Sequence, residues 1–273
     1  MDAAKKIRFG IIGAGNMGEA ILRGFVSGGN AGDTDVVIYD PFIEKCERLK
    51  EELNVSIAPS LEELIDESDI LLIAIKPNVC AHVFAEQKKH FASKAVISIA
   101  AGWGGEKLKN ALPASARILR VMPNTPAMVG AGMIVFEQGD TLTKAEKEFA
   151  QKLFSSVGEV ISVEPKLMDA VTAVSGSGPA YVYLFIEALA DGGVMAGLPR
   201  GVALKLAAQT VKGSAMMVEQ TGVHPGELKD RVCSPGGTTI DAVASLESNG
   251  FRGTVIEAVD VCREKSERMS KQS

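Results

Sequence analysis

A glycine-rich turn between an apolar run and a helical pattern constrains this chain more than any other feature. The run Ile7–Ile12 leads into GAGNMG at residues 13–18, and residues 19–26 then place apolar side chains three and four apart. This order predicts a strand, a tight turn and a helix, as in a dinucleotide-binding unit. Gly13 permits the turn, Gly15 lets a pyrophosphate approach, and Gly18 lets the helix pack on the strand.

The motif alone also fits a simple turn before a buried helix, so its surroundings decide between the two interpretations. The next predicted strand, residues 35–39, ends at Asp40, which follows Gly18 at close to the spacing of about 20 residues expected for an acid that contacts a ribose hydroxyl. We therefore predict a dinucleotide whose phosphates lie at the positive end of the first helix.

Beyond Asp40 the pattern alternates between helices and strands. Helices are expected over residues 44–53, 61–66 and 79–91, and strands over 55–57, 69–75, 95–99 and 118–122. Such alternation predicts a mostly parallel sheet that is covered by helices on both faces.

Two of these strands end where chemistry can occur, because ligands of open α/β sheets bind outside the carboxyl ends of the strands. Small residues at Ala74, Ala100 and Ala101 leave space for a flat ring, and Lys76-Pro77 follows the first of them. Lys76 can face a phosphate or be a solvated loop lysine. Asn124 lies between two prolines that should keep its loop extended, and it is either a site residue or a turn asparagine bonded to its own backbone.

The first region is completed by a strand over 132–136, a helix over 143–157 and a strand over 159–163, which places a domain boundary near residue 164. The second domain, 165–273, has no clear strand pattern, and its helices are expected over 167–173, 180–195, 200–220, 239–248 and 254–269. Its early helices are rich in small residues and poor in charge, which fits either a tight core or a subunit interface. We predict a homodimer.

A second glycine loop, at residues 230–241, is the most informative segment of this half. Pro235 stiffens it, Gly236 and Gly237 allow unusual backbone angles, and Thr238 to Asp241 resembles a capping box. Consecutive backbone N–H groups at a helix start bind anions, and the hydroxyls of Ser234, Thr238 and Thr239 add uncharged donors. The loop either holds a small carboxylate or only caps a helix.

Composition excludes several other functions. The net charge of −5 and the isoelectric point near 5.4 come without basic runs, so nucleic acid is not an expected partner. The longest apolar runs are too short for a membrane span, and the first strand begins so early that no signal peptide is expected, which favours a cytoplasmic protein. The spacing of the cysteines and histidines predicts no metal site, and the cysteines are expected to be buried thiols.

The chain resembles the pyrroline-5-carboxylate reductases from end to end. The segments GAGNMG, AIKP, SIAAG, RVMPNTP and SGSGPAY match the family in order, and DRVCSPGGTTIDAVASLE fits its signature. The resemblance implies a Rossmann-type, mostly parallel α/β domain over 1–164 and an all-helical substrate-binding and dimerisation domain over 165–273. It also implies a homodimer, which in this family often assembles into a ring of dimers.

The activity implied by the resemblance is hydride transfer from NADPH or NADH to (S)-1-pyrroline-5-carboxylate, which gives L-proline. The substrate carboxylate would contact Ser234 and the N–H groups of Gly237 and Thr238, and Thr239, as the catalytic residue, would bind the ring nitrogen. Gly236 completes the substrate loop. The residues expected to contact the cofactor are Ile12, Gly13, Gly15, Asn16, Met17, Asp40, Ala74, Lys76, Pro77, Ala100, Ala101 and Asn124.

Asp40 departs from what NADPH use requires. An acid at this position favours a free ribose 2′-hydroxyl and repels a 2′-phosphate, and no arginine follows it. The sequence therefore favours NADH.

Two other functions remain as alternatives. A β-hydroxyacid dehydrogenase shares the general plan, but it needs a lysine soon after the segment Ser175–Gly178, and the next lysine is Lys205. A nucleotide-sensing regulator without catalysis would keep the first glycine loop, but it gives no reason for the second.

Overall fold

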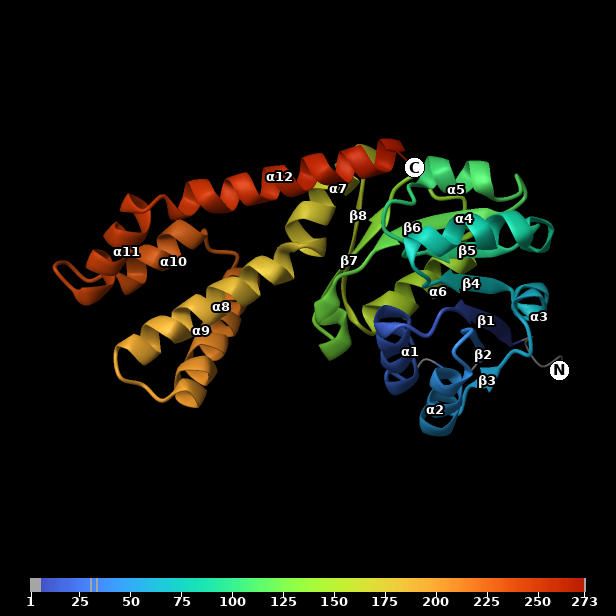
Figure 1. Ribbon diagram of the computed structural model, residues 1–273, viewed down its shortest axis with the longest axis horizontal. Helices are drawn as coiled ribbons and strands as arrows, with labels where there is room; N and C mark the ends of the chain where they lie inside the picture. Colours follow the sequence, from blue (N-terminus) through green and yellow to red (C-terminus); the bar gives the residue numbers. More distant parts are fainter. Residues whose placement is uncertain (1–5, 30, 33, 273) are drawn as a thin grey trace. The chain divides into compact units, whose positions relative to one another are not determined.

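The computed structural model describes residues 6–29, 31–32 and 34–272 of the chain. Internal packing divides the protein into two compact units, and Figure 1 colours them along the sequence. The sheet unit comprises residues 1–176 together with 263–273, and the helical unit comprises residues 177–262.

The described residues of the sheet unit form one eight-stranded sheet in the order β3-β2-β1-β4-β5-β6-β7-β8. All neighbouring strands are parallel except β6 and β7, which are antiparallel. The strands are β1 (Ile7–Ile12), β2 (Thr34–Tyr39), β3 (Ser56–Ile57), β4 (Ile70–Ile73), β5 (Ala95–Ser98), β6 (Arg117–Met122), β7 (Gly132–Glu137) and β8 (Gly158–Val163). This arrangement confirms the predicted mostly parallel sheet.

Helices cover both faces of this sheet because its central strands carry apolar side chains on alternate faces. In β4, Ile70 and Leu72 pack on one side, and Leu71 and Ile73 pack on the other. The first side is covered by α1 (Asn16–Ser27), α2 (Ile43–Leu53) and α6 (Lys144–Ser155). The second is covered by α3 (Leu61–Glu67), α4 (Pro77–Glu86) and α5 (Gly105–Ala111).

Three phenylalanines fix the first side against the sheet. Phe9 of β1 lies 5.9 Å from Phe25 of α1 and 5.1 Å from Phe149 of α6, measured between ring centroids, with the rings edge to face. All three are buried. Edge-to-face pairs add about 0.5–1.5 kcal/mol each beyond the burial of apolar area, so this cluster holds α1, and the glycine turn before it, against β1.

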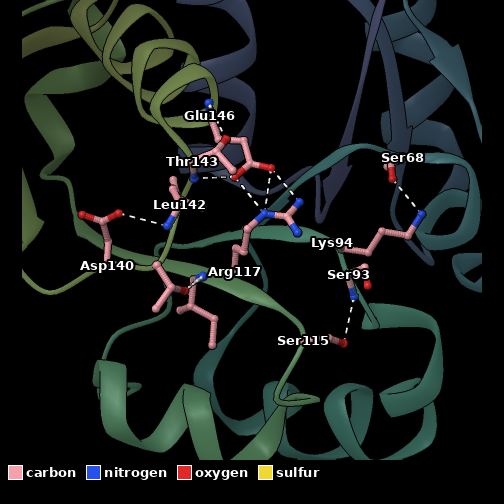
Figure 2. A network of polar contacts seen from close by, with 11 residues as sticks. Ser68, Ser93, Lys94, Ser115, Arg117, Asp140, Leu142, Thr143 and Glu146 are labelled. Carbon is pink, nitrogen blue, oxygen red and sulfur yellow. Dashed lines mark hydrogen bonds and ion pairs between the residues drawn. The ribbon is translucent and has the colours of Figure 1, made fainter.

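A polar network joins the beginning of β6 to the beginning of α6 (Figure 2). The Arg117 guanidinium donates hydrogen bonds of 2.6–2.9 Å to both carboxylate oxygens of Glu146. Glu146 also accepts the Thr143 N–H (2.8 Å) and donates its own N–H to Thr143 Oγ1 (3.3 Å), which makes a capping box for α6. Burial alone would raise the pKa of Glu146, but the bonds from Arg117 and Thr143 outweigh burial and lower it.

Several expectations about local structure were wrong. The loop after Asn124 was expected to be extended, but residues Thr125–Val129 form a 3₁₀ helix. The helix expected over 79–91 ends at Glu86 and is followed by a separate 3₁₀ helix, Lys88–Phe91. The one expected over 167–173 consists of a 3₁₀ turn, α7 (Met168–Val171) and a π-helix. Two helices were not anticipated, α5 and α10 (Pro225–Val232).

The helical unit has a small core of its own. Within the described residues, its buried apolar core consists of Ala190, Ala203 and Ala207, at the contact between α8 (Gly178–Met195) and α9 (Arg200–Thr221). Alanines and glycines let these helices approach closely, since a Cβ at Gly193 would lie 3.1 Å from the Ala203 Cβ. The unit continues with α10 and α11 (Thr238–Ser248) and with α12 (Phe251–Gln272), whose final residues belong to the sheet unit.

Candidate active site

The sheet order places a ligand edge at the carboxyl ends of β1, β2, β4 and β5. The order reverses at β1, because β2 lies on one side of it and β4 on the other. Open α/β sheets bind ligands outside such a switch point. The residues that follow these four strands, at positions 13, 40, 74 and 99, therefore share one edge of the sheet.

The glycine turn after β1 has the geometry that its sequence predicts. Gly13 has a φ of +104°, and a Cβ there would lie 2.6 Å from the Ala74 carbonyl oxygen. A Cβ at Gly18 would lie 2.4 Å from the Gly13 carbonyl oxygen, so only glycine allows this approach of α1 to the turn. A Cβ at Gly15, by contrast, would meet open space, with no neighbouring atom within 4 Å. The turn is tight where it meets the protein and open where a pyrophosphate would lie.

The start of α1 has no side-chain cap. Its N-cap is Gly15, which makes no side-chain hydrogen bond, and Asn16 is exposed while Met17 is half-buried. The first N–H groups of a helix need an acceptor, and the helix dipole favours an anion there. Ile12, just before the turn, is buried. The uncapped start of α1 therefore suits a dinucleotide phosphate.

Asp40 connects the glycine turn to the loop after β2. Its Oδ2 accepts the Ala14 N–H at 2.8 Å, and its Oδ1 accepts the Phe42 N–H at 3.0 Å. Each carboxylate oxygen has two lone-pair sites, so both oxygens can still accept from a ribose hydroxyl. This connection between the first glycine loop and Asp40 could not be predicted from spacing alone.

The arginines of α1 and α2 are paired with carboxylates. Arg48 bonds Glu19 at 2.6 Å, and Arg23 bonds both Glu19 (2.8 Å) and Glu52. The Lys45 ammonium lies 4.9 Å from the centroid of the Phe42 ring. Both arginines therefore have carboxylate partners, and Lys45 lies over the Phe42 ring, so the charge at the end of β2 is that of Asp40.

The other predicted cofactor residues follow β4, β5 and β6. Ala74 is half-buried and donates its N–H to the Ile12 carbonyl at 2.8 Å, while Lys76 and Pro77 are exposed at the start of α4. Ala100 is buried, and Ala101 is exposed in the β5–α5 loop.

Asn124 is held by both ends of its amide. Its Oδ1 accepts the Met133 N–H at 2.8 Å, and its Nδ2 donates to the Ser175 carbonyl at 3.0 Å. It therefore connects three segments of the sheet unit, rather than bonding its own backbone as a turn asparagine does. A contact between Asn124 and the cofactor stays a prediction.

The second glycine loop, in the helical unit, joins α10 to α11. The predicted capping box at Thr238 is wrong, because the N-cap of α11 is Gly237 and no side chain caps the helix. Gly236 has a φ of +63°, and the Gly237 N–H donates to the Ser234 carbonyl at 3.0 Å. Ser234 and Thr238 are exposed and Thr239 is half-buried. The start of α11 is thus open to an anion, with three hydroxyls close by in sequence.

The thiols and imidazoles show little sign of chemistry. Cys46 and Cys80 are buried as expected, and burial raises the pKa of Cys80 to about 11, whereas Cys233 and Cys262 are only half-buried. His90 bonds Asp66 at 2.7 Å and lies 3.4 Å from Glu62, a grouping that spacing did not indicate. Their ligand atoms lie within 4.8 Å of one another and could hold a metal ion, but both carboxylates are exposed and each imidazole nitrogen already faces one.

Comparisons with known proteins agree with this geometry. A family model described as "NADP oxidoreductase coenzyme F420-dependent" matches residues 8–102, which contain the glycine turn and Asp40. A second one, described as "Pyrroline-5-carboxylate reductase dimerisation", matches residues 165–269. The fold, the edge site and these matches define an NAD(P)-dependent oxidoreductase.

The similarity extends over nearly the whole chain. The pyrroline-5-carboxylate reductase of Escherichia coli is 44% identical over 97% of this chain and 98% of its own, and that of Glycine max is 44% identical over 98% and 97%. A Plasmodium falciparum pyrroline carboxylate reductase, solved with NADP bound, has a TM-score of 0.86 at 36% identity and covers 98% of this chain and 100% of its own. The chain belongs to the pyrroline-5-carboxylate reductase family.

This result confirms the resemblance inferred from the motifs. The dimerisation match begins one residue after the predicted boundary at 164, whereas the compact units divide after residue 176, and the domain division stays a prediction. In the described part of the chain, no helix has the length and apolar character needed to cross a bilayer. A cytoplasmic location stays a prediction.

Proposed function

We propose that this protein reduces (S)-1-pyrroline-5-carboxylate to L-proline, with the first glycine loop binding the nicotinamide cofactor and the second binding the substrate. The observation that carries the proposal is the pair of uncapped helix starts, at α1 and α11, each preceded by a glycine turn. The first suits the phosphates of a dinucleotide, and the second suits a small carboxylate with hydroxyl donors beside it.

The residues of the second loop then bind and orient the substrate. Ser234 Oγ and the N–H of Thr238 would donate to the carboxylate, together with the Gly237 N–H if it shares or exchanges its bond to Ser234. Thr239 Oγ1 would accept the N–H of the protonated imine and hold the ring at a fixed angle. The bound nicotinamide supplies the hydride that reduces the imine carbon.

Most of the acceleration on this proposal comes from position and orientation. A protonated imine is already a good electrophile, so the protein needs no strong acid, and holding the two reactants in line can supply about 7–11 kcal/mol. Thr239 contributes by favouring the protonated form of the ring nitrogen.

Thr239 provides the test of the mechanism. Thr239→Ala is expected to lower turnover by about 100-fold, the effect of losing a positioned proton-handling group, while cofactor affinity changes little. Thr239→Ser keeps the hydroxyl and should retain most of the activity. Turnover that is unchanged in Thr239→Ala would refute the assignment.

The activity itself is tested by loss of nicotinamide absorbance when the purified protein meets pyrroline-5-carboxylate. A β-hydroxy acid with the oxidised cofactor is the control. Reduction of the imine acid supports the proposal, oxidation of the hydroxy acid favours the β-hydroxyacid dehydrogenase, and no change with either favours the regulator.

We further propose that NADH is the preferred cofactor. Asp40 is hydrogen-bonded to the glycine turn, so a 2′-phosphate at the end of β2 would meet a carboxylate. The arginines of α1 and α2 are already paired with Glu19 and Glu52. The ratio of kcat/KM for the two cofactors tests this preference directly, and a ratio in favour of NADPH would contradict it.

A homodimer is proposed from the surface of the helical unit. The core of this unit consists of three alanines, while large apolar side chains of α8 and α9 are exposed. They include Leu184, Leu206 and Met195, whose exposed fractions are 68%, 53% and 90%. A second copy of the unit would cover this surface. A monomeric mass by light scattering at micromolar concentration would contradict the dimer, and the same measurement tests whether dimers associate further into a ring.

A further inference from the structure

The β5–α5 loop contains the only tryptophan of the chain, and it is buried. Trp103 lies two positions after Ala101 and is 4% exposed, although the residues around it in the loop are half-buried or exposed. Its indole Nε1 donates a 3.0 Å hydrogen bond to the carbonyl oxygen of Pro77. Pro77 is the first residue of α4, so this bond joins the loop after β5 to the loop after β4.

The indole is held on several sides. The Phe84 ring of α4 meets it edge to face at 5.0 Å, and the Lys107 ammonium lies 4.1 Å from its ring centroid. The indole is kept in place by the Phe84 ring and by its own hydrogen bond, because the buried ring cannot turn without losing both.

The backbone on either side of Trp103 is fixed as well. The Trp103 N–H donates to the Ala100 carbonyl at 3.3 Å, with Gly102 at a φ of +73° between them. Two residues beyond, the Gly105 N–H donates to Glu137 Oε1 at 3.1 Å, and Glu137 also pairs with Arg120 at 2.7 Å. The loop is therefore anchored at its turn, at its indole and at its far end.

We propose that Trp103 is a positioning residue for the nicotinamide cofactor: its hydrogen bond to Pro77 holds the Lys76-Pro77 and Ala100-Ala101 segments at one spacing, so that the cofactor meets both without rearranging them. The inference rests on the proposed placement of the cofactor against these two segments. A side chain that only filled space would need the shape of the indole but not its N–H group.

The test exploits the fact that this chain has a single tryptophan. Growth of a tryptophan auxotroph on β-(3-benzothienyl)alanine replaces the N–H by sulfur at position 103 alone and keeps the bicyclic shape. 4-Fluorotryptophan, which keeps the N–H, is the matched control. Affinity for NADH is measured by calorimetry on the intact protein, and KM and kcat are measured alongside.

Loss of the N–H is expected to raise the Kd and KM for NADH about fivefold, the effect of one neutral hydrogen bond, with kcat at saturating NADH unchanged. The fluorinated protein should match the unsubstituted one. An unchanged Kd in the benzothienyl protein would overturn the inference, as would an equal rise in the fluorinated protein.

A second variant separates the hydrogen bond from the general packing of the indole. Lys107→Gln removes the cation above the ring and leaves the N–H bond to Pro77, so its NADH affinity should be unchanged, and a fivefold loss there would also overturn the inference. If the unsubstituted protein binds neither NADH nor NADPH, the proposed cofactor site itself fails and the positioning role fails with it. Failure of the cofactor site is thus distinguished from failure of the Trp103 role alone, in which NADH binds equally well with and without the indole N–H.

Discussion

Replacing Asp40 by asparagine should shift the enzyme away from NADH and toward NADPH. The substitution removes the negative charge at the end of β2 and keeps one acceptor oxygen for either the Ala14 or the Phe42 N–H. The other N–H loses its partner, which should weaken both cofactors alike. The ratio of the two kcat/KM values therefore reports the charge, because the common loss cancels.

The size of the shift follows from electrostatics. A 2′-phosphate carries about 1.5 to 2 negative charges. At about 5 Å, a carboxylate repels each of these charges by about 0.8 kcal/mol in water and by about 3 kcal/mol at an effective dielectric constant of about 20. Asp40 is half-buried at an open edge, so the lower value applies. We expect about 1.5 kcal/mol in total, which is about a tenfold fall in the NADH-to-NADPH ratio.

A gain of charge at the same place tests the reasoning from the other direction. Phe42 is 66% exposed, so Phe42→Arg adds a cation beside Asp40 with little loss of packing and should raise kcat/KM for NADPH. Phe42→Gln is the uncharged control. Initial rates with both cofactors, measured at low and at moderate salt, provide the ratios. A ratio that does not move in Asp40→Asn would refute the role of this charge.

Two further predictions concern the scaffold of the site. Gly18→Ala places a Cβ 2.4 Å from the Gly13 carbonyl oxygen and should cost about 1–3 kcal/mol in urea unfolding, whereas Gly15→Ala meets open space and should weaken cofactor binding with a stability change below about 1 kcal/mol. Glu146→Gln should cost about 1–2 kcal/mol at neutral pH. Because the pKa of Glu146 is lowered in the folded state, its contribution is complete above the ordinary value of 4.5 and is lost as the pH falls through the lower value, so the difference from wild type should vanish in acid. A stability difference between Glu146→Gln and wild type that persists in acid would contradict the role of the Glu146 charge. A Gly18→Ala protein as stable as wild type would contradict the close packing at Gly18.

The sequence predicted the parts of the fold that depend on local patterns. The turn at Gly13, the acid at Asp40 and the buried strand β4 each follow from residues that lie close together in the chain. The alternation of strands and helices then gives the sheet class, because parallel strands need covered faces.

Contacts between distant residues were out of reach. The bonds from Ala14 to Asp40, from Trp103 to Pro77 and from Asn124 to Ser175 join segments 26 to 51 residues apart, and no periodicity encodes them. The capping box inferred from Thr238 and Asp241 failed for a related reason. Its letters fit the motif, but the extended backbone at Gly237 makes that glycine the N-cap and leaves the helix start without a side-chain cap.

The helical unit is an insertion in the covalent order of the sheet unit, and this affects how the chain matures. The chain leaves the sheet unit after Gly176 and rejoins it at Arg263. In the finished protein, Asp169 accepts a 2.6 Å hydrogen bond from Ser266, which is synthesised almost a hundred residues later. Domains emerging from the ribosome usually fold in sequence. Here the nucleotide-binding half is translated early but receives its final helical turns only after the whole helical unit has been made.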